Sequence, residues 1–142
     1  FQQEELTEFV SKRKEYDDTP KISFYGIDYK TKVGELIRQF DLMISQYGGF
    51  ISESCKEYLK VGGILLVNNS HGDAGLASID KDYALIAAVY KTKGRYRISE
   101  TSLEQYFIPK KDTNITRELL FEMQKGIGYT KTAPLYIFRR IA

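Results

Sequence analysis

The stretch FDLMISQYGGFISESCKEYLKVGGILLVNNS, residues 40–70, decides the fold that we expect. Residues 40–45 are a nearly all-apolar run bounded by polar residues, which is typical of a parallel strand buried on both faces. Residues 50–60 read as a helix, and Val61-Gly62-Gly63 should end it, because glycine accepts positive φ. Residues 64–68 predict the next buried strand. The stretch therefore predicts a right-handed strand–helix–strand unit with two adjacent parallel strands.

Further elements are expected on both sides of this unit. Apolar residues at helical spacing predict an amphipathic helix before it, and runs of β-branched and aromatic residues predict strands. There is no internal repeat, linker or low-complexity tract, so the sequence predicts one domain over residues 1–142. The predicted helices cover residues 3–16, 31–39, 102–107 and 114–125, the last capped by Asn114 or Thr116, and the predicted strands cover 21–28, 83–90, 95–99 and 133–140.

Composition limits the class of protein. Hydrophobic residues make up 42% and charged residues 28% of the 142 residues, which is normal for a globular protein. The net charge of +2 gives no strong nucleic-acid signal, although it leaves room for a local patch. The apolar runs are far shorter than the ~20 residues of a membrane span, so no membrane partner is expected. A single cysteine, Cys55, excludes an internal disulfide and makes the cytoplasm the default compartment.

Three polar clusters follow predicted strands. In open α/β sheets, ligands bind outside the carboxyl ends of the parallel strands, so the shared position of the clusters predicts one binding edge. The clusters are Gly26-Ile27-Asp28-Tyr29, Ser45-Gln46-Tyr47-Gly48-Gly49 and Asn68-Asn69-Ser70-His71-Gly72-Asp73.

Individual residues in these clusters allow more than one role. Asp28 at a strand tip could accept two hydrogen bonds from ribose hydroxyls, or it could cap a turn. His71, the only histidine, could act with Asp73 as a general base or metal ligand, or simply bond to the backbone. One His and one Asp do not make a metal site by spacing, so no metal site is predicted. Cys55 on an apolar helical stripe predicts a buried small hydrophobe rather than a nucleophile. Six basic residues in turns and strand ends read as solvated surface, with a modest basic rim around a site as the alternative: Lys30, Lys32, Lys91, Lys93, Arg95 and Arg97.

Residues 40–70 resemble the middle of a class I S-adenosylmethionine-dependent methyltransferase. Residues 40–45 match the "fDlIi" strand of that family, and residues 59–63 match its "LkpGG" turn, with Val61 where proline is common. The run FYGID, residues 24–28, is similar to the second strand, whose last acidic residue holds the cofactor ribose. A strand at Tyr83, a helix near Thr116 and a last strand at Ala133 are similar to the closing antiparallel hairpin. The resemblance implies an α/β fold with a Rossmann-like, mostly parallel sheet, flanking helices and a C-terminal antiparallel hairpin.

Two departures from the family pattern stand out. The glycine-rich motif I loop, G-x-G-x-G, is missing from the 142 residues. The stretch between Asp28 and Phe40 is too short for a full helix and a third strand, so we expect the N-terminal part of the domain to be truncated. In addition, Ser45-Gln46-Tyr47-Gly48 stands where amino-group methylating enzymes often carry Asn-Pro-Pro-Tyr, which argues against base N-methylation.

The resemblance implies a function and a set of site residues. The cofactor would be S-adenosylmethionine, and the methyl acceptor, a small molecule, RNA or protein, is left unknown. An alternative is a non-catalytic methyltransferase-like binding or interaction module, and the apolar content would allow a homodimer through an edge strand. A different nucleotide-using enzyme has no P-loop or dinucleotide fingerprint to favour it. The implied cofactor-binding residues are Asp28, Ser45, Gln46 and Tyr47, the substrate-binding residues are Asn68, Asn69 and Asp73, and the catalytic residue is His71.

Overall fold

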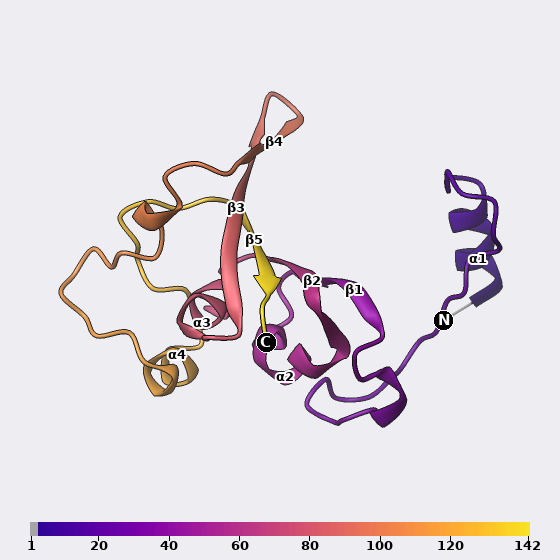
Figure 1. Ribbon diagram of the computed structural model, residues 1–142, viewed down its shortest axis with the longest axis horizontal. Helices are drawn as coiled ribbons and strands as arrows, with labels where there is room; N and C mark the ends of the chain where they lie inside the picture. Colours follow the sequence, from indigo (N-terminus) through magenta and orange to yellow (C-terminus); the bar gives the residue numbers. More distant parts are fainter. Residues whose placement is uncertain (1–2) are drawn as a thin grey trace.

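A computed structural model describes residues 3–142, which form one five-stranded sheet with short helices (Figure 1). The strand order is β1-β2-β5-β3-β4. The strands are β1 (Phe40–Ser45), β2 (Leu59–Val67), β3 (Tyr83–Thr92), β4 (Arg95–Ser99) and β5 (Leu135–Arg140). The α-helices are α1 (Gln3–Ser11), α2 (Ile51–Ser54), α3 (Asp73–Ile79) and α4 (Arg117–Met123), and the 3-10 helices are η1 (Gly34–Leu36), η2 (Lys56–Tyr58) and η3 (Leu103–Gln105).

The prediction of a Rossmann-like, mostly parallel sheet is wrong. Only β1 and β2 pair in parallel, whereas β2–β5, β5–β3 and β3–β4 are all antiparallel. The sheet is mixed because the last strand, β5, inserts between β2 and β3, and because a tight turn folds β4 back on β3. The adjacent parallel pair predicted from residues 40–70 is confirmed.

The carboxyl ends of β1, β2 and β3 nevertheless point in the same direction. Because β5 runs opposite to both β2 and β3, the strands β1, β2 and β3 all point the same way. The register across the sheet joins Ser45 to Val67, Val67 to Tyr136, and Tyr136 to Ala88. The loops that follow β1 and β2 therefore leave the sheet side by side, whereas β3 continues past that level to Thr92.

The connection between β1 and β2 differs from the predicted long helix. It holds a single α-helical turn, α2, followed by η2, and β2 already begins at Leu59. Gly62 and Gly63 lie inside β2 as a bulge, because the register jumps from Phe40↔Leu59 to Leu42↔Ile64. Gly62 has φ 89°, and a Cβ on Gly63 would lie 2.7 Å from the Leu59 side chain. The glycine pair therefore bends a strand here instead of ending a helix.

The N-terminal prediction is also corrected. α1 ends at Ser11, and residues 21–28 form no strand. Within the described residues β1 is the last strand on this side of the sheet, so residues 21–28 add no strand to it, and Phe24 and Ile27 are exposed. Figure 1 shows α1 standing away from the sheet at the end of this irregular segment.

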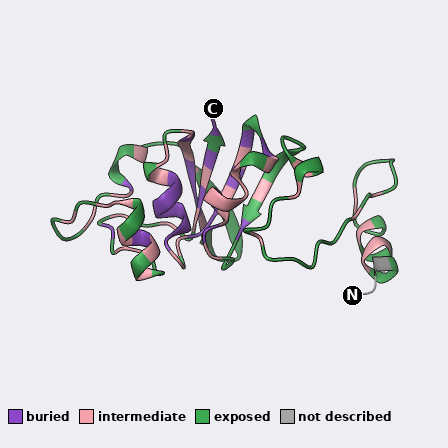
Figure 2. Cartoon of the chain, turned by 90° about the horizontal axis from the view of Figure 1, so that it is seen from below, coloured by how far each residue is buried: buried purple, intermediate pink, exposed green. Residues whose placement is uncertain are grey.

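The core lies on one face of the sheet. Leu65, Val67, Tyr136 and Phe138 are at most 1% exposed and pack in one cluster with Ala74 of α3. Figure 2 shows the buried residues gathered on the central strands and α3. The sequence analysis placed a polar cluster at residues 68–73 and predicted no helix between it and the strand at 83–90, so α3 was not predicted.

Candidate functional site

The loops after β1 and β2 are joined by the buried side chain of Asn68. The Asn68 backbone N–H donates to the carbonyl of Ser45 at 3.2 Å, which continues the parallel ladder past Val67. Asn68 Oδ1 accepts from the Tyr47 backbone N–H at 3.4 Å and from the Ser70 hydroxyl at 3.0 Å. The structure thus brings together Ser45, Tyr47 and Asn68, three residues that were predicted from the clusters.

A hydrogen-bond chain fixes the ring of His71. The Ser70 hydroxyl lies 3.0 Å from His71 Nδ1. Asn68 Oδ1 receives donors from Tyr47 and Ser70 and so must be the amide oxygen. The Ser70 hydroxyl donates either to this oxygen or to His71 Nδ1, and when it donates to the oxygen, Nδ1 carries the proton and the Nε2 lone pair is free. This arrangement suits His71 to accept a proton.

Tyr47 is held in an unusual conformation at the carboxyl end of β1. It has φ 58°, in the left-handed region that is costly for a residue with a Cβ, and its side chain is 74% exposed. A strained, exposed aromatic residue points to a functional constraint rather than to packing. The following Gly49 also has positive φ, and a Cβ there would lie 2.9 Å from the Tyr29 hydroxyl.

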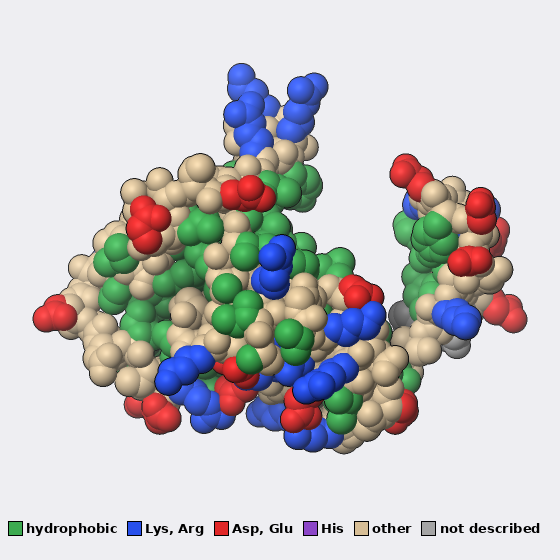
Figure 3. All heavy atoms as spheres, in the orientation of Figure 1, with side chains coloured by type: hydrophobic (Ala, Val, Ile, Leu, Met, Phe, Trp, Pro, Cys, Tyr) green, Lys and Arg blue, Asp and Glu red, His purple; other side chains and the backbone are tan. Residues whose placement is uncertain are grey.

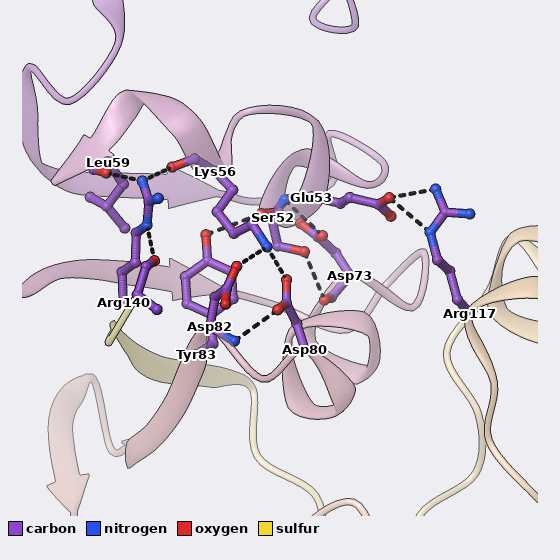
Figure 4. Close-up of polar contacts among 11 residues, drawn as sticks. Ser52, Glu53, Lys56, Leu59, Asp73, Asp80, Asp82, Tyr83, Arg117 and Arg140 are labelled. Atoms are coloured by element: carbon purple, nitrogen blue, oxygen red, sulfur yellow. Dashed lines mark hydrogen bonds and ion pairs between the residues drawn. The ribbon is translucent and has the colours of Figure 1, made fainter. Parts of the chain in front are cut away.

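Asp73 lies in the interior and holds elements together. It is 2% exposed, and its two carboxylate oxygens accept from Ser45 Oγ at 2.5 Å and from the Ser52 backbone N–H at 3.0 Å. Burial raises the pKa of Asp73, and the hydrogen bonds from Ser45 and Ser52 oppose that rise. Figure 4 shows the carboxylate directed toward Ser52 at the start of α2. Both oxygens are therefore used within the fold rather than presented to a ligand.

Asn69 is likewise tied to the protein. Its Oδ1 accepts from the Gly75 backbone N–H at 2.9 Å, so the side chain anchors the loop to α3. Gly126 packs so closely on it that a Cβ there would lie 2.4 Å from the Asn69 carbonyl oxygen. The predicted substrate residues thus divide into a loop linker, Asn68, and two anchors, Asn69 and Asp73.

Asp28 and Gln46 are exposed, like Tyr47. Asp28 does not end a strand; its Oδ1 accepts from the Lys30 backbone N–H at 2.8 Å within a local turn. It reaches the loop after β1 only through its neighbour Tyr29, which packs on Gly49. The Cys55 thiol lies 3.6 Å from the Tyr29 carbonyl oxygen, and burial, followed by the charge of Asp73, raises its pKa. That thiol is suited to packing rather than to nucleophilic attack.

A second polar cluster, which the sequence reasoning missed, surrounds the joint between α2, α3 and β3 (Figure 4). Lys56 Nζ contacts the carboxylates of Asp80 at 2.8 Å and Asp82 at 2.6 Å. Burial alone would lower the pKa of Lys56, but the hydrogen bonds and charges of the two carboxylates outweigh it and raise that pKa. The Tyr83 hydroxyl donates to the Ser52 carbonyl, and burial raises its pKa. The only sequence signal for this cluster was the Asp80-Lys81-Asp82 spacing.

Residues 3–142 contain no cluster of metal-ligating side chains and no helix that could span a membrane. No group of three His, Cys, Asp or Glu side chains in that range lies close enough to hold a metal ion. No helix there has the length and apolar character needed to cross a bilayer. Comparison of the chain with protein-family models, curated proteins and solved structures found no match.

Proposed function

We propose that this protein takes part in S-adenosylmethionine-dependent methyl transfer, with the acceptor held at the loops after β1 and β2. The observation that carries the proposal is the chain Asn68–Ser70–His71 beside the end of a parallel strand pair, which in the Nδ1–H tautomer leaves the Nε2 lone pair of His71 free. The resemblance of residues 40–70 to class I methyltransferases gives the reaction class. Because its one cysteine is a free thiol, we assign the protein to the reducing cytoplasm.

The described residues account for only part of the contacts that S-adenosylmethionine needs. Asp28 has an exposed carboxylate with only Oδ1 engaged in its local turn, so it retains acceptor capacity for ribose hydroxyls. Gln46 and Tyr47 are exposed on the neighbouring loop, whereas the Cβ positions of Gly48 and Gly49 face Ile51 and the Tyr29 hydroxyl. A G-x-G-x-G loop is absent from the sequence, so the contacts that it would make have no counterpart among these residues.

The mechanism follows from the roles of the chain's own groups. When bound, the cofactor supplies an electrophilic methyl group. Asn68 holds the Tyr47 backbone and Ser70 in fixed positions, so the acceptor meets a preorganised edge. Ser70 keeps the imidazole of His71 in the Nδ1–H form, and Nε2 then accepts the proton that the acceptor loses. Ser45 and Asp73 orient the end of β1 beneath these loops.

Calorimetric titration with S-adenosylmethionine tests the proposal. We expect saturable binding, and Asp28→Ala should weaken it by about 1–3 kcal/mol because charge-assisted hydrogen bonds to ribose are lost. Asp18→Ala is the matched control, since Asp18 is another exposed aspartate of the N-terminal segment, and it should leave affinity unchanged. No heat at millimolar cofactor would remove the proposal, and equal affinities of parent and Asp28→Ala would remove Asp28 from the site.

A second candidate function is a non-catalytic module that forms a homodimer through β1. Within residues 3–142, β1 is an edge strand, and its outward side chains Leu42 and Ile44 are 53% and 58% exposed. An open edge that carries aliphatic side chains favours strand pairing. A second copy of β1 offers the same edge and the same side chains, so the contact is self-complementary about a two-fold axis.

Sedimentation measurements test the dimer. The parent should be dimeric at micromolar concentration, and Ile44→Lys should make it monomeric. Val61→Lys, at another exposed aliphatic position, on β2, is the control and should leave the dimer intact. A monomeric parent would exclude this candidate without affecting the methyl-transfer proposal.

A further inference from the structure

The β3–β4 arm, residues 90–97, projects beyond the edge at which the candidate site lies (Figure 1). The pairing of β3 with β5 ends at Val89↔Leu135, but β3 and β4 continue as a two-stranded ribbon as far as Thr92↔Arg95. Lys93 and Gly94 form the turn, both with positive φ, which is the geometry of a tight two-residue hairpin. The arm is thus a defined hairpin rather than a loose loop.

Positive charge concentrates on this arm. Its exposed residues include four basic side chains, and Figure 3 shows Lys and Arg gathered at the projecting tip, with acidic side chains only near its base. The whole chain has a net charge of only +2, so this density is local. The four are Lys91, Lys93, Arg95 and Arg97.

An exposed aromatic ring shares one face of the arm with Lys91, whereas Arg95 and Arg97 project from the other face. Tyr96 is 66% exposed, and Lys91 Nζ lies 5.3 Å from its ring centroid on the paired strand. An aromatic face beside cations matches the way proteins bind single-stranded nucleic acid, in which bases stack and phosphates meet Lys or Arg. A duplex hides its base faces within the stack and so offers the ring nothing to stack on.

The arm is close to the candidate site. Ala88 of β3 pairs with Tyr136 of β5, which pairs in turn with Val67 at the end of β2. Thr92 lies four residues beyond Ala88, which is about 13 Å along the strand. Two inter-strand spacings, about 10 Å in total, separate β3 from β2 across β5. A third spacing separates β2 from β1, so a single strand of several nucleotides that runs from the arm across β5 would span the distance to the loops after β2 and β1.

We propose that the β3–β4 arm binds single-stranded RNA and presents it to the loops after β1 and β2, so that RNA is the methyl acceptor. This inference rests on the proposed function. The proton-accepting Nε2 of His71 suits a ribose hydroxyl as the acceptor group. That hydroxyl oxygen bonds the methyl carbon while the carbon–sulfur bond breaks, with its electron pair left on sulfur, and the hydroxyl proton passes to Nε2.

Fluorescence anisotropy with a short labelled oligouridine, in the absence of cofactor, tests binding by the arm. Arg95→Gln/Arg97→Gln should weaken binding at least about tenfold and reduce the salt slope by about 1.4, which is about 0.7 for each phosphate that these side chains no longer neutralise. Lys110→Gln/Lys111→Gln removes the same charge from exposed positions outside the arm and should change affinity little. Equal decreases in affinity for the two double variants would overturn the proposal.

The aromatic ring provides an independent readout. Tyr96→Ala should weaken binding about tenfold because the stacked base loses its partner, whereas Tyr96→Phe keeps the ring and should bind like the parent. Absence of oligouridine binding, equal affinity for duplex RNA, or arm-dependent binding to anionic vesicles alone would each overturn the proposal.

A turnover assay separates this inference from the proposed function. Parent protein with S-adenosylmethionine should form S-adenosylhomocysteine with oligouridine and not with oligodeoxyuridine, which lacks the 2′-hydroxyl. If the cofactor binds but oligouridine is not methylated, RNA is excluded as the acceptor and methyl transfer stands. If RNA binds through the arm but the cofactor does not, the methyl-transfer proposal fails and RNA binding stands.

Discussion

Ser45 Oγ donates a hydrogen bond of 2.5 Å to Asp73 Oδ2 and so joins the end of β1 to the first residue of α3. The other oxygen of the same carboxylate accepts from the Ser52 backbone N–H in α2. One buried side chain therefore fixes three elements that converge below the candidate site. The stability of the molecule and the position of the loops after β1 and β2 depend on the same carboxylate.

Asp73→Ala should lower the free energy of unfolding by about 2–3 kcal/mol, because it leaves a buried N–H and a buried hydroxyl without acceptors. Asp73→Asn should cost much less, since its amide oxygen can accept from Ser52 while its NH₂ group donates to the Ser45 hydroxyl. Urea denaturation of both variants measures the two costs. Equal costs for Ala and Asn would show that the hydrogen bonds are not what Asp73 contributes.

Stability should depend on pH through the same residue. Burial raises the pKa of Asp73 above its ordinary value of 3.8, so the folded protein binds this proton more tightly than the unfolded chain does. The contribution of Asp73 to stability is then greatest below about pH 4 and falls as pH rises through the raised pKa. The free energy of unfolding of Asp73→Asn minus that of the parent should rise over this window and then level off. Urea titrations at a series of pH values check the trend, and a difference that falls with pH would contradict it.

Gly75 and Tyr129 should be coupled. A Cβ on Gly75 would lie 2.6 Å from the Tyr129 hydroxyl, which is buried and, among the described residues, has no hydrogen-bond partner. Burial, with a smaller effect of Tyr136, raises the pKa of Tyr129 to about 12, so the hydroxyl stays neutral. Tyr129→Phe should stabilise the fold or leave it unchanged, because it removes an unpaired buried polar group.

A double-mutant cycle measures that coupling. Gly75→Ala alone should destabilise the protein through the clash, but in the Tyr129→Phe background it should stabilise α3 by up to about 1 kcal/mol, because alanine is the better helix former. Thermal unfolding of the four proteins supplies the cycle. Additive effects would mean that the hydroxyl does not restrict this position.

Thr116 caps α4, as the sequence led us to expect for Thr116 or Asn114. Its side chain accepts from the Leu119 backbone N–H at 3.2 Å, and the Thr116 backbone is extended. Thr116→Ala should therefore destabilise the protein by about 1 kcal/mol. Thr132→Ala, at an exposed position outside any helix, is the control and should have little effect on the urea midpoint.

Local pattern predicted the strands well and the connections poorly. The run from Ile64 falls in β2, where Leu65 and Val67 are fully buried, as such a run requires. The run at Phe40–Ser45 forms β1, but Leu42 and Ile44 are exposed at the end of the sheet, so the expected burial of this strand on both faces is wrong. The Gly62-Gly63 pair is compatible with a helix end and with a strand bulge, and only the pairing register of β2 with β1 distinguishes the two structures. The insertion of β5 between β2 and β3 is a long-range choice that no short window of sequence contains.

The candidate site shows the same division. Position after a strand correctly brought Ser45, Tyr47 and Asn68 together. It could not reveal that Asp73 points into the interior, because α3 begins at that residue and the partners Ser45 and Ser52 are distant in sequence. Asp28 was selected as a strand end, and the strand itself does not form.

His71 offers a direct test of the hydrogen-bond chain that carries the proposed function. It is the only histidine, so ¹⁵N-histidine labelling gives one imidazole in a long-range ¹H–¹⁵N spectrum. At alkaline pH we expect the Nδ1–H tautomer to predominate, because in it the Ser70 hydroxyl donates to Asn68 Oδ1 and accepts from the ring. Ser70→Ala removes that acceptor and should shift the spectrum toward the Nε2–H tautomer, whereas Ser78→Ala, in α3, should leave it unchanged. A parent spectrum dominated by Nε2–H would mean that Nε2 is not free to accept a proton, and His71 would then lose its role as the base.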